Sequence, residues 1–149
     1  MQKIREHSSD ITDDLDQLLK WVSFNVLIGN ADAHAKNLSM LLSQTGIWLA
    51  PFYDILSTTV YGDSHDNDVA MSIGRQFNTE QITRDDRKTM ADFLDINIKL
   101  VARTNAIMQR DIDLALKVAL KEFDSVYGSN ATVDKIVEVV TKRKKLILI

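Results

Sequence analysis

Cysteine is absent from this chain of 149 residues, which excludes disulfide bridges and metal sites built on thiolate ligands. No apolar run approaches the length of about 20 residues that a membrane-spanning helix needs. The formal net charge is −3, so the chain lacks the excess of basic residues that general nucleic-acid-binding proteins carry. The first ten residues are polar and do not resemble a signal peptide. These absences favour a soluble cytoplasmic protein that contacts neither membrane nor nucleic acid directly.

Glycine and proline are scarce, with five glycines and one proline in the whole chain. The glycines are spread from Gly29 to Gly128, so they do not form the Gly-rich loop that cradles a nucleotide phosphate. The sequence also lacks internal repeats and low-complexity tracts. Its length suits one domain with a sizeable core, and we expect residues 1–149 to form that single domain.

The most informative stretch runs from Gly29 to Asn37 and reads Gly-Asn-Ala-Asp-Ala-His-Ala-Lys-Asn; Pro-Phe-Tyr-Asp, ending at Asp54, follows it. Asp32, Asn37 and Asp54 stand in an order that suits phosphoryl transfer. In a kinase-type site one Asp orients the attacking hydroxyl, an Asn five residues later holds magnesium, and a later Asp holds the metal that bridges the phosphates. Magnesium prefers oxygen ligands. Asn37 and Asp54 are therefore candidate magnesium ligands, and Asp32 is left to face the acceptor hydroxyl.

Two strings of sequence, Gly29 to Ser39 and Leu49 to Thr58, together resemble the catalytic segment of the HipA-like serine/threonine kinases, the toxins of HipBA-type toxin–antitoxin modules. Two later segments, Ala70 to Gly74 and Ile82 to Asp86, resemble the family's continuation less specifically. The resemblance implies a protein-kinase-like C-lobe. It also implies transfer of the γ-phosphate of ATP to a protein hydroxyl, with Mg²⁺ and ATP as cofactors.

The resemblance also implies a role for each residue of the site. Asp32 would be the catalytic Asp, Asn37 and Asp54 would hold the magnesium and its nucleotide, and His34 and Lys36 would support the loop near the phosphates. Conventional kinases carry a Lys two residues after the catalytic Asp, whereas this chain has His34 there. The residues after Asp54 also do not complete a DFG motif.

Few residues precede Asp32, and the Gly-rich loop and phosphate-binding Lys of a kinase N-lobe have no counterpart among them. We therefore expect half an active site, inactive alone, whose ATP and Mg²⁺ need the missing N-terminal lobe. The chain would be a piece of a longer kinase, a separate subunit or a decayed remnant. The resemblance implies a helix-turn-helix antitoxin of HipB type as a partner. It also implies a protein substrate such as an aminoacyl-tRNA synthetase.

A β-hairpin explains how two ligands distant in sequence could share one metal. Two short apolar runs, residues 38–42 and 47–50, flank a turn of Ser-Gln-Thr-Gly that ends at Gly46. A strand that leaves Asn37, turns and returns would bring Asp54 back beside it.

The remaining segments predict a mainly α (α+β) fold, a helical bundle with this small hairpin. A helix over residues 11–28, with Ser9 or Asp10 as N-cap, would deliver the catalytic loop. A mobile loop over residues 58–69 would follow the hairpin. A helix is expected after Thr83, with Met90, Phe93 and Leu94 on one face. Further helices are expected over residues 98–108, from 111 or 112 to 127, and from Asn130 or Thr132 to the basic cluster 142–145. The apolar tail beyond this cluster should pack on this domain or on a partner.

Two other classes of function fit parts of the sequence. A metal-dependent phosphohydrolase of the His-Asp kind would use His34, His65 and Asp66, but it explains Asn37 and Asp54 poorly. A non-catalytic module that keeps the C-lobe shape would bind an antitoxin or the missing lobe. Phosphate release without an acceptor protein would favour the hydrolase. Unchanged partner binding after substitution of the candidate carboxylates would favour the module.

Overall fold

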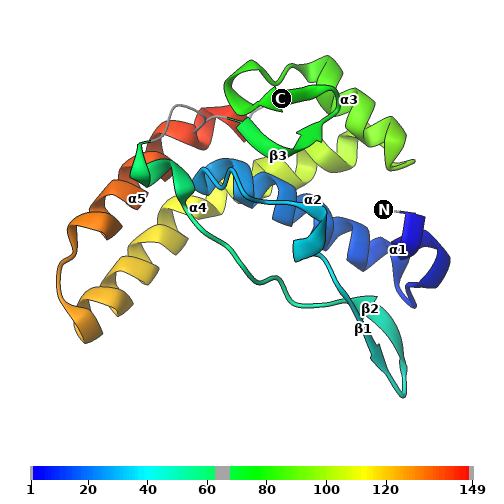
Figure 1. Ribbon diagram of the computed structural model, residues 1–149, viewed down its shortest axis with the longest axis horizontal. Coiled ribbons are helices and arrows are strands. Elements are labelled where there is room, and N and C mark those ends of the chain that lie inside the picture. The colour runs from blue at the N-terminus through cyan, green and yellow to red at the C-terminus, as the bar shows by residue number, and fades with distance from the viewer. Residues whose placement is uncertain (1, 63–67, 148–149) are drawn as a thin grey trace.

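The computed structural model describes residues 2–62 and 68–147, and its architecture is mainly helical with two small antiparallel hairpins (Figure 1). The helices are α1 (Gln2–His7), α2 (Ile11–Ile28), α3 (Arg84–Phe93), α4 (Ile98–Tyr127) and α5 (Ala131–Arg143). The strands are β1 (Met40–Ser43), β2 (Gly46–Leu49), β3 (Asp68–Ile73) and β4 (Gln76–Asn78). The predicted mainly α fold with a small hairpin is confirmed; the second hairpin is an addition.

Helix α2 lies at the centre of the domain and packs against α4, α5 and the C-terminal 3₁₀ turn over residues 144–147 (Figure 1). Its apolar stripe includes Leu18, Leu19 and Leu27, all almost completely buried. The carboxylate of Asp10 caps the helix by accepting the Asp13 N–H at 3.0 Å. Gly29 ends it in a left-handed conformation, φ +67°. The predicted bounds of this helix are confirmed.

The hairpin of β1 and β2 pairs Met40 with Leu49 at its open end and Ser43 with Gly46 at its turn, as the sequence predicts. The buried Asp14 fastens it to α2, because both of its carboxylate oxygens lie 3.0 Å from the Leu49 N–H. A buried carboxylate needs such a donor to offset the loss of hydration. The hairpin is therefore held at its base, where the chain returns toward the loop after α2.

The sequence does not predict the second hairpin, β3 and β4, of which only Asp68 and Val69 fall within the loop expected over residues 58–69. Val69 and Ile73 are buried, whereas Ala70 and Ser72 are exposed. This alternation is that of a strand with one face on the core. The turn uses Gly74 at φ +65°, where a Cβ atom would lie 2.2 Å from the backbone oxygen of Asp86. The sequence predicts a mobile loop over residues 58–69, but Thr58–Tyr61 form a 3₁₀ turn and Asp68 and Val69 begin β3. Residues 63–67 lie outside the described residues.

The long helix α4 corrects the expectation of two separate helices before Gly128. It runs without a break over 30 residues, because no Gly or Pro interrupts the stretch and Asp111 forms an exposed ion pair with Arg110 instead of capping a new helix. Phe93 is a second correction. It is exposed, unlike Met90 and Leu94, because it is the last residue of α3 and lies at the rim of a surface hollow.

The C-terminal segment packs on this domain, as predicted. Asn130 caps α5 by accepting the Thr132 N–H at 2.9 Å. Within the basic cluster, Arg143 is buried and donates from Nε to the Val26 carbonyl at 2.8 Å. Ile147 is almost fully buried. In the described part of the chain, no helix combines the length and the apolar character needed to cross a membrane.

The capping box of α3, formed by Thr83 and Asp86, should stabilise the fold to an extent that depends on pH. Asp86 Oδ2 accepts the Thr83 N–H at 2.9 Å, and Thr83 Oγ1 accepts the Asp86 N–H at 3.2 Å. The hydrogen bonds from Thr83 lower the pKa of Asp86 below its ordinary value of 3.8. Because the folded-state pKa is lowered, the stabilisation is present above that ordinary value and disappears as the pH falls through the folded-state value. Thr83→Ala should therefore cost about 1 kcal/mol near neutral pH and less in acid.

Urea unfolding at neutral pH and below pH 3.8 measures this difference. Thr89→Ala is the matched control, because Thr89 lies on the same helix and donates its hydroxyl proton to a backbone carbonyl. Its effect should not change with pH. An effect of Thr83→Ala that is equally large in acid would show that the hydrogen bond of 2.6 Å from the Thr83 hydroxyl to Asp86 Oδ2 contributes nothing to the cap.

The end of α2 makes a second prediction, because Gly29 is left-handed and crowded. A Cβ atom there would lie 2.2 Å from the side-chain oxygen of Thr59. Gly62 has a similar left-handed backbone, φ +78°, but among the described residues no atom lies within 4 Å of where its Cβ would be. Gly62→Ala should cost about 1 to 2 kcal/mol from backbone strain alone. Gly29→Ala should cost clearly more in urea unfolding, and equal losses would mean that the contact with Thr59 gives way freely.

Candidate functional site

Two buried asparagines organise the loop that follows α2. Asn30 donates from Nδ2 to Asn25 Oδ1 at 2.8 Å, and Asn25 donates in turn to the Trp21 carbonyl at 2.8 Å. Asn30 Oδ1 accepts the backbone N–H of Asp32 at 3.0 Å. Buried amides are costly unless their hydrogen bonds are made, so this chain of contacts fixes the backbone just before the candidate catalytic residue. The backbone at Asp32 is thereby anchored to the body of α2.

The candidate catalytic residue, Asp32, holds its carboxylate in solvent, with 63% of the side chain exposed. His34 Nε2 lies 3.8 Å from Asp32 Oδ1, close enough for an ion pair when the imidazole is protonated. Lys36 is also exposed, and its backbone carbonyl accepts the Tyr53 hydroxyl at 2.9 Å. The structure therefore gathers Asp32 and His34 at one point. Lys36 contributes its backbone to the site and extends its side chain into solvent.

Asn37 and Asp54 meet across the hairpin. Asn37 is buried, and its Nδ2 donates to Asp54 Oδ2 at 3.2 Å. The backbone at Asp54 is left-handed, φ +58°, which is uncommon for a residue other than glycine. Such a conformation persists only where the surrounding contacts impose it. The hairpin thus brings together the two residues that the sequence names as magnesium ligands.

This pair fits a magnesium ion by the chemistry of its donors. The Asn37 amide oxygen and the Asp54 carboxylate are hard oxygen ligands, and one partner is rigidly buried while the other faces solvent. Within residues 2–62 and 68–147, no group of three or more His, Cys, Asp or Glu side chains is arranged to hold a metal. A site with two protein ligands suits magnesium, which keeps water and phosphate oxygens in its remaining positions.

The sequence analysis missed a third set of residues, Ser57, Thr58 and Thr59, which join the chain after Asp54 to the end of α2. Ser57 donates to the Ile28 carbonyl at 2.6 Å, and the hydroxyl of Thr58 accepts the N–H of Ala31 at 2.8 Å. The run of three consecutive hydroxyl residues after an apolar pair is a sequence pattern from which these contacts could have been predicted. Asn25 and Asn30, polar residues at the buried end of an apolar helix, carry a similar signal.

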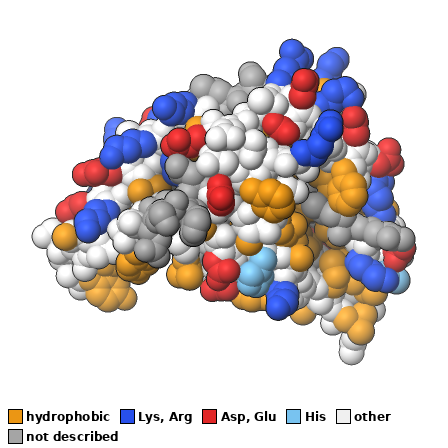
Figure 2. Space-filling view, turned by 45° about the horizontal axis from the view of Figure 1, so that its top comes forward, with side chains coloured by type: hydrophobic (Ala, Val, Ile, Leu, Met, Phe, Trp, Pro, Cys, Tyr) orange, Lys and Arg blue, Asp and Glu red, His pale blue; other side chains and the backbone are white. Residues whose placement is uncertain are grey.

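Of two hollows on the described surface, one adjoins the loop. A mainly apolar hollow of about 490 Å³ is lined by α2 around Trp21, by Ala33, by residues 69–74 and by Phe77 and Phe93. Figure 2 shows one face of the molecule, on which basic side chains alternate with acidic and apolar ones and form no single basic patch. Ala33 connects the apolar hollow with the catalytic loop.

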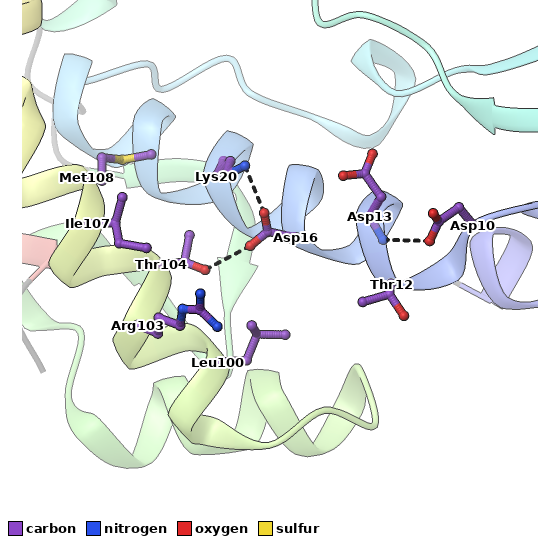
Figure 3. Close-up of a pocket in the computed structure, with 10 residues that line it drawn as sticks. All are labelled: Asp10, Thr12, Asp13, Asp16, Lys20, Leu100, Arg103, Thr104, Ile107 and Met108. Carbon is purple, nitrogen blue, oxygen red and sulfur yellow. Dashed lines mark hydrogen bonds and ion pairs between the residues drawn. The ribbon is translucent and has the colours of Figure 1, made fainter.

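The other hollow, of about 610 Å³, lies between α2 and α4 and contains none of the predicted site residues (Figure 3). Asp16 is held within it by Lys20 at 2.8 Å and by the Thr104 hydroxyl at 3.2 Å. The dashed contacts in Figure 3 join Asp16 to Lys20 and Thr104 and the backbone N–H of Asp13 to the Asp10 carboxylate, so the Asp16 and Asp10 carboxylates already have partners inside the domain. This hollow is separate from the candidate site.

Comparison with known proteins gives relatives over nearly the whole chain. A protein of Sinorhizobium fredii, Y4mE, whose name assigns it only provisionally to the kinases, is 31% identical over 144 residues, which are 97% of this chain and 34% of that protein. The serine/threonine-protein kinase toxin HipA of Shewanella oneidensis is 40% identical over 65 residues, 44% of this chain and 15% of that protein. The chain thus spans about a third of the length of the first of these relatives.

A solved structure shares the fold. HipA in a complex of Shewanella oneidensis HipA, HipB and operator DNA matches with a TM-score of 0.79 and 22% identity, over 97% of this chain and 33% of that chain. That similarity confirms the predicted kinase-like architecture. The family model described as the HipA-like C-terminal domain matches residues 1–141, nearly all of the sequence. The chain therefore belongs to the family of HipA-like C-terminal domains.

Proposed function

We propose that this chain is the lobe of a HipA-like serine/threonine kinase that provides Asp32 to the acceptor and Asn37 and Asp54 to magnesium. One observation carries the proposal: Asn37 and Asp54, distant in sequence, touch at 3.2 Å beside the loop that holds Asp32. Oxygen ligands of this kind bind the metal that accompanies ATP, and the order of the three residues is that of a kinase. The reaction would transfer the γ-phosphate of ATP to a protein hydroxyl.

The residues act mainly by position and charge, since phosphoryl transfer needs little covalent help from a protein. The exposed Asp32 carboxylate would accept the proton of the acceptor hydroxyl and aim its oxygen at the phosphate. His34, 3.8 Å away, would hold that carboxylate in place when protonated. Asn37 and Asp54 would hold Mg²⁺, which when bound neutralises charge on the phosphates. The fixed backbone around Asn30 would keep these groups in register.

The remainder of the kinase would come from outside this segment. Y4mE is about three times as long as the stretch matched here, and the Gly-rich loop and phosphate-binding Lys have no counterpart in this sequence. We propose that an N-terminal lobe supplies them and that this chain alone does not turn over. The similar HipA was solved with HipB and DNA, which supports a helix-turn-helix partner of HipB type for the complete kinase. A translation protein such as an aminoacyl-tRNA synthetase is the proposed substrate.

The metal site is testable on this chain by NMR with Mn²⁺, a paramagnetic substitute for Mg²⁺, in the presence of ATP. Mn²⁺ should broaden the side-chain amide signals of Asn37 before those of other asparagines. Asp54→Asn should weaken that broadening several-fold, because it removes a charged oxygen ligand. Asp95→Asn is the matched control, since Asp95 is also exposed and has a left-handed backbone, φ +52°. Both substitutions therefore place an Asn in the same backbone conformation.

Broadening that is unaffected by Asp54→Asn, or that centres on other carboxylates, would contradict the assignment of the ligands. Calorimetric titration of MgATP into the same proteins would then show whether nucleotide binds at all. Clear binding by the wild-type chain, lost in Asp54→Asn, would mean that this lobe builds a working nucleotide site without the other.

The role of Asp32 is testable in the complete kinase that contains this segment. Asp32→Asn keeps the size of the side chain but removes its basic oxygen, so phosphotransfer should fall by about 10²- to 10⁴-fold. Nucleotide affinity and the unfolding midpoint should change little, because the side chain is exposed. Asp92→Asn, an exposed carboxylate on α3, is the matched control. Undiminished transfer would remove Asp32 from its role, and phosphate release without any acceptor would favour the hydrolase.

A further inference from the structure

The segment just after Asp54 is fastened to the end of α2 by hydroxyl groups. Ser57 Oγ donates to the Ile28 carbonyl at 2.6 Å, and Thr58 Oγ1 donates to the Gly29 carbonyl at 3.0 Å. The backbone N–H of Thr59 donates to that same Gly29 carbonyl at 3.2 Å. The last carbonyls of a helix have no partner within the helix, so each of these donors satisfies a group that would otherwise be unpaired.

Thr58 differs from its neighbours because its hydroxyl is both donor and acceptor. While it donates to the Gly29 carbonyl, it also accepts the N–H of Ala31 at 2.8 Å. The two contacts span the residues that lead directly into Asp32. On the next residue, the N–H of Asp32 is held by Asn30 Oδ1. One hydroxyl and one amide therefore fix two successive backbone groups at the catalytic position.

We propose that Thr58 is a positioning residue for the reaction, one that sets where Asp32 stands relative to Asp54. This inference rests on the proposed function. Thr58 lies four residues after Asp54 and one hydrogen bond away from the residue before Asp32, so it joins the two halves of the site by a short path. Displacement of a reacting group by about 1 Å can cost a hundredfold in rate, so such a link matters more for chemistry than for folding.

The structure also separates positioning by Thr58 from simple docking of the segment. The side chain of Thr59 lies against Gly29, so closely that a Cβ atom on Gly29 would meet it at 2.2 Å. Ser57 makes its own contact with the Ile28 carbonyl. When the hydroxyl of Thr58 is removed, these contacts keep the segment on α2. The lost contacts are then those to the Ala31 N–H and the Gly29 carbonyl, at the residues that lead into Asp32.

Thr58→Val, Thr58→Ser and Thr59→Val in the ¹⁵N-labelled chain make the test. Valine keeps the shape of threonine but cannot hydrogen-bond, so Thr58→Val should raise amide hydrogen exchange at Ala31 at least tenfold. Leu18 and Leu19, in the core of α2, should exchange at nearly unchanged rates. Thr58→Ser keeps the hydroxyl and should restore slow exchange. Thr59→Val is the matched control, because among the described residues the buried Thr59 hydroxyl has no hydrogen-bond partner.

A second readout, relaxation by bound Mn²⁺, reports position directly. With Mn²⁺ and ATP present, Thr58→Val should change the relaxation of the Asp32 amide and leave that of the Asn37 amide unchanged, and Thr58→Ser should restore the wild-type value. Absence of Mn²⁺ binding would sink the proposed metal site while exchange at Ala31 still decides the anchoring by Thr58. Exchange at Ala31 that rises only in step with Leu18, relaxation at Asp32 that does not change with Mn²⁺ bound, or failure of Thr58→Ser to restore either signal would overturn the inference.

Discussion

The C-terminal end of α2 is the constraint on which the rest of the structure depends. A helix that stops inside a domain presents carbonyls that must find donors, and it does so here next to the candidate catalytic loop. The carbonyls of Ile28 and Gly29 are satisfied by the segment after Asp54, and the carbonyl of Val26 is satisfied by Arg143 from the last helix. Residues 57–59 and Arg143, distant from each other and from α2 in the sequence, converge at this helix end and donate to its carbonyls. The site is a consequence of that convergence.

Rigid and exposed groups are divided in a way that suits the proposed chemistry. The groups that fix geometry, Asn25, Asn30 and Asn37, are buried and hydrogen-bonded. The carboxylates that would meet substrate and metal, Asp32 and Asp54, stay in solvent, and Asn37 would add its amide oxygen to the metal from the buried side. Burying the amides costs little once their partners are present, whereas burying the carboxylates without a cation would cost much more. In the proposed kinase, this division would hold Asp32 and Asp54 ready for substrate and metal.

Local signals predicted the elements that local physics determines. The helix over 11–28 follows from apolar spacing, the cap at Asp10 and the glycine at its end, and the first hairpin follows from two apolar runs around a turn. Tertiary contacts decided what was missed. The second hairpin depends on the close approach of Gly74 to the backbone of Asp86. Arg143 belongs to the basic cluster 142–145, and its burial depends on a partner in α2, the Val26 carbonyl. The meeting of Asn37 and Asp54 was predictable because a hairpin fixes it; the link through Thr58 was not, since its partners lie 27 and 29 residues away.

This pattern ties the site to the fold of its own lobe more closely than to any single loop. Neither Asp32 nor Asp54 is placed by its immediate neighbours alone: the first depends on Asn30 and Thr58, and the second depends on the hairpin that Asp14 fastens to α2. Because these supports share one helix, the two carboxylates cannot drift apart without disturbing α2 itself. The lobe can then keep its half of the site in register on its own, and a second lobe would need to contribute the phosphate contacts without rebuilding this geometry.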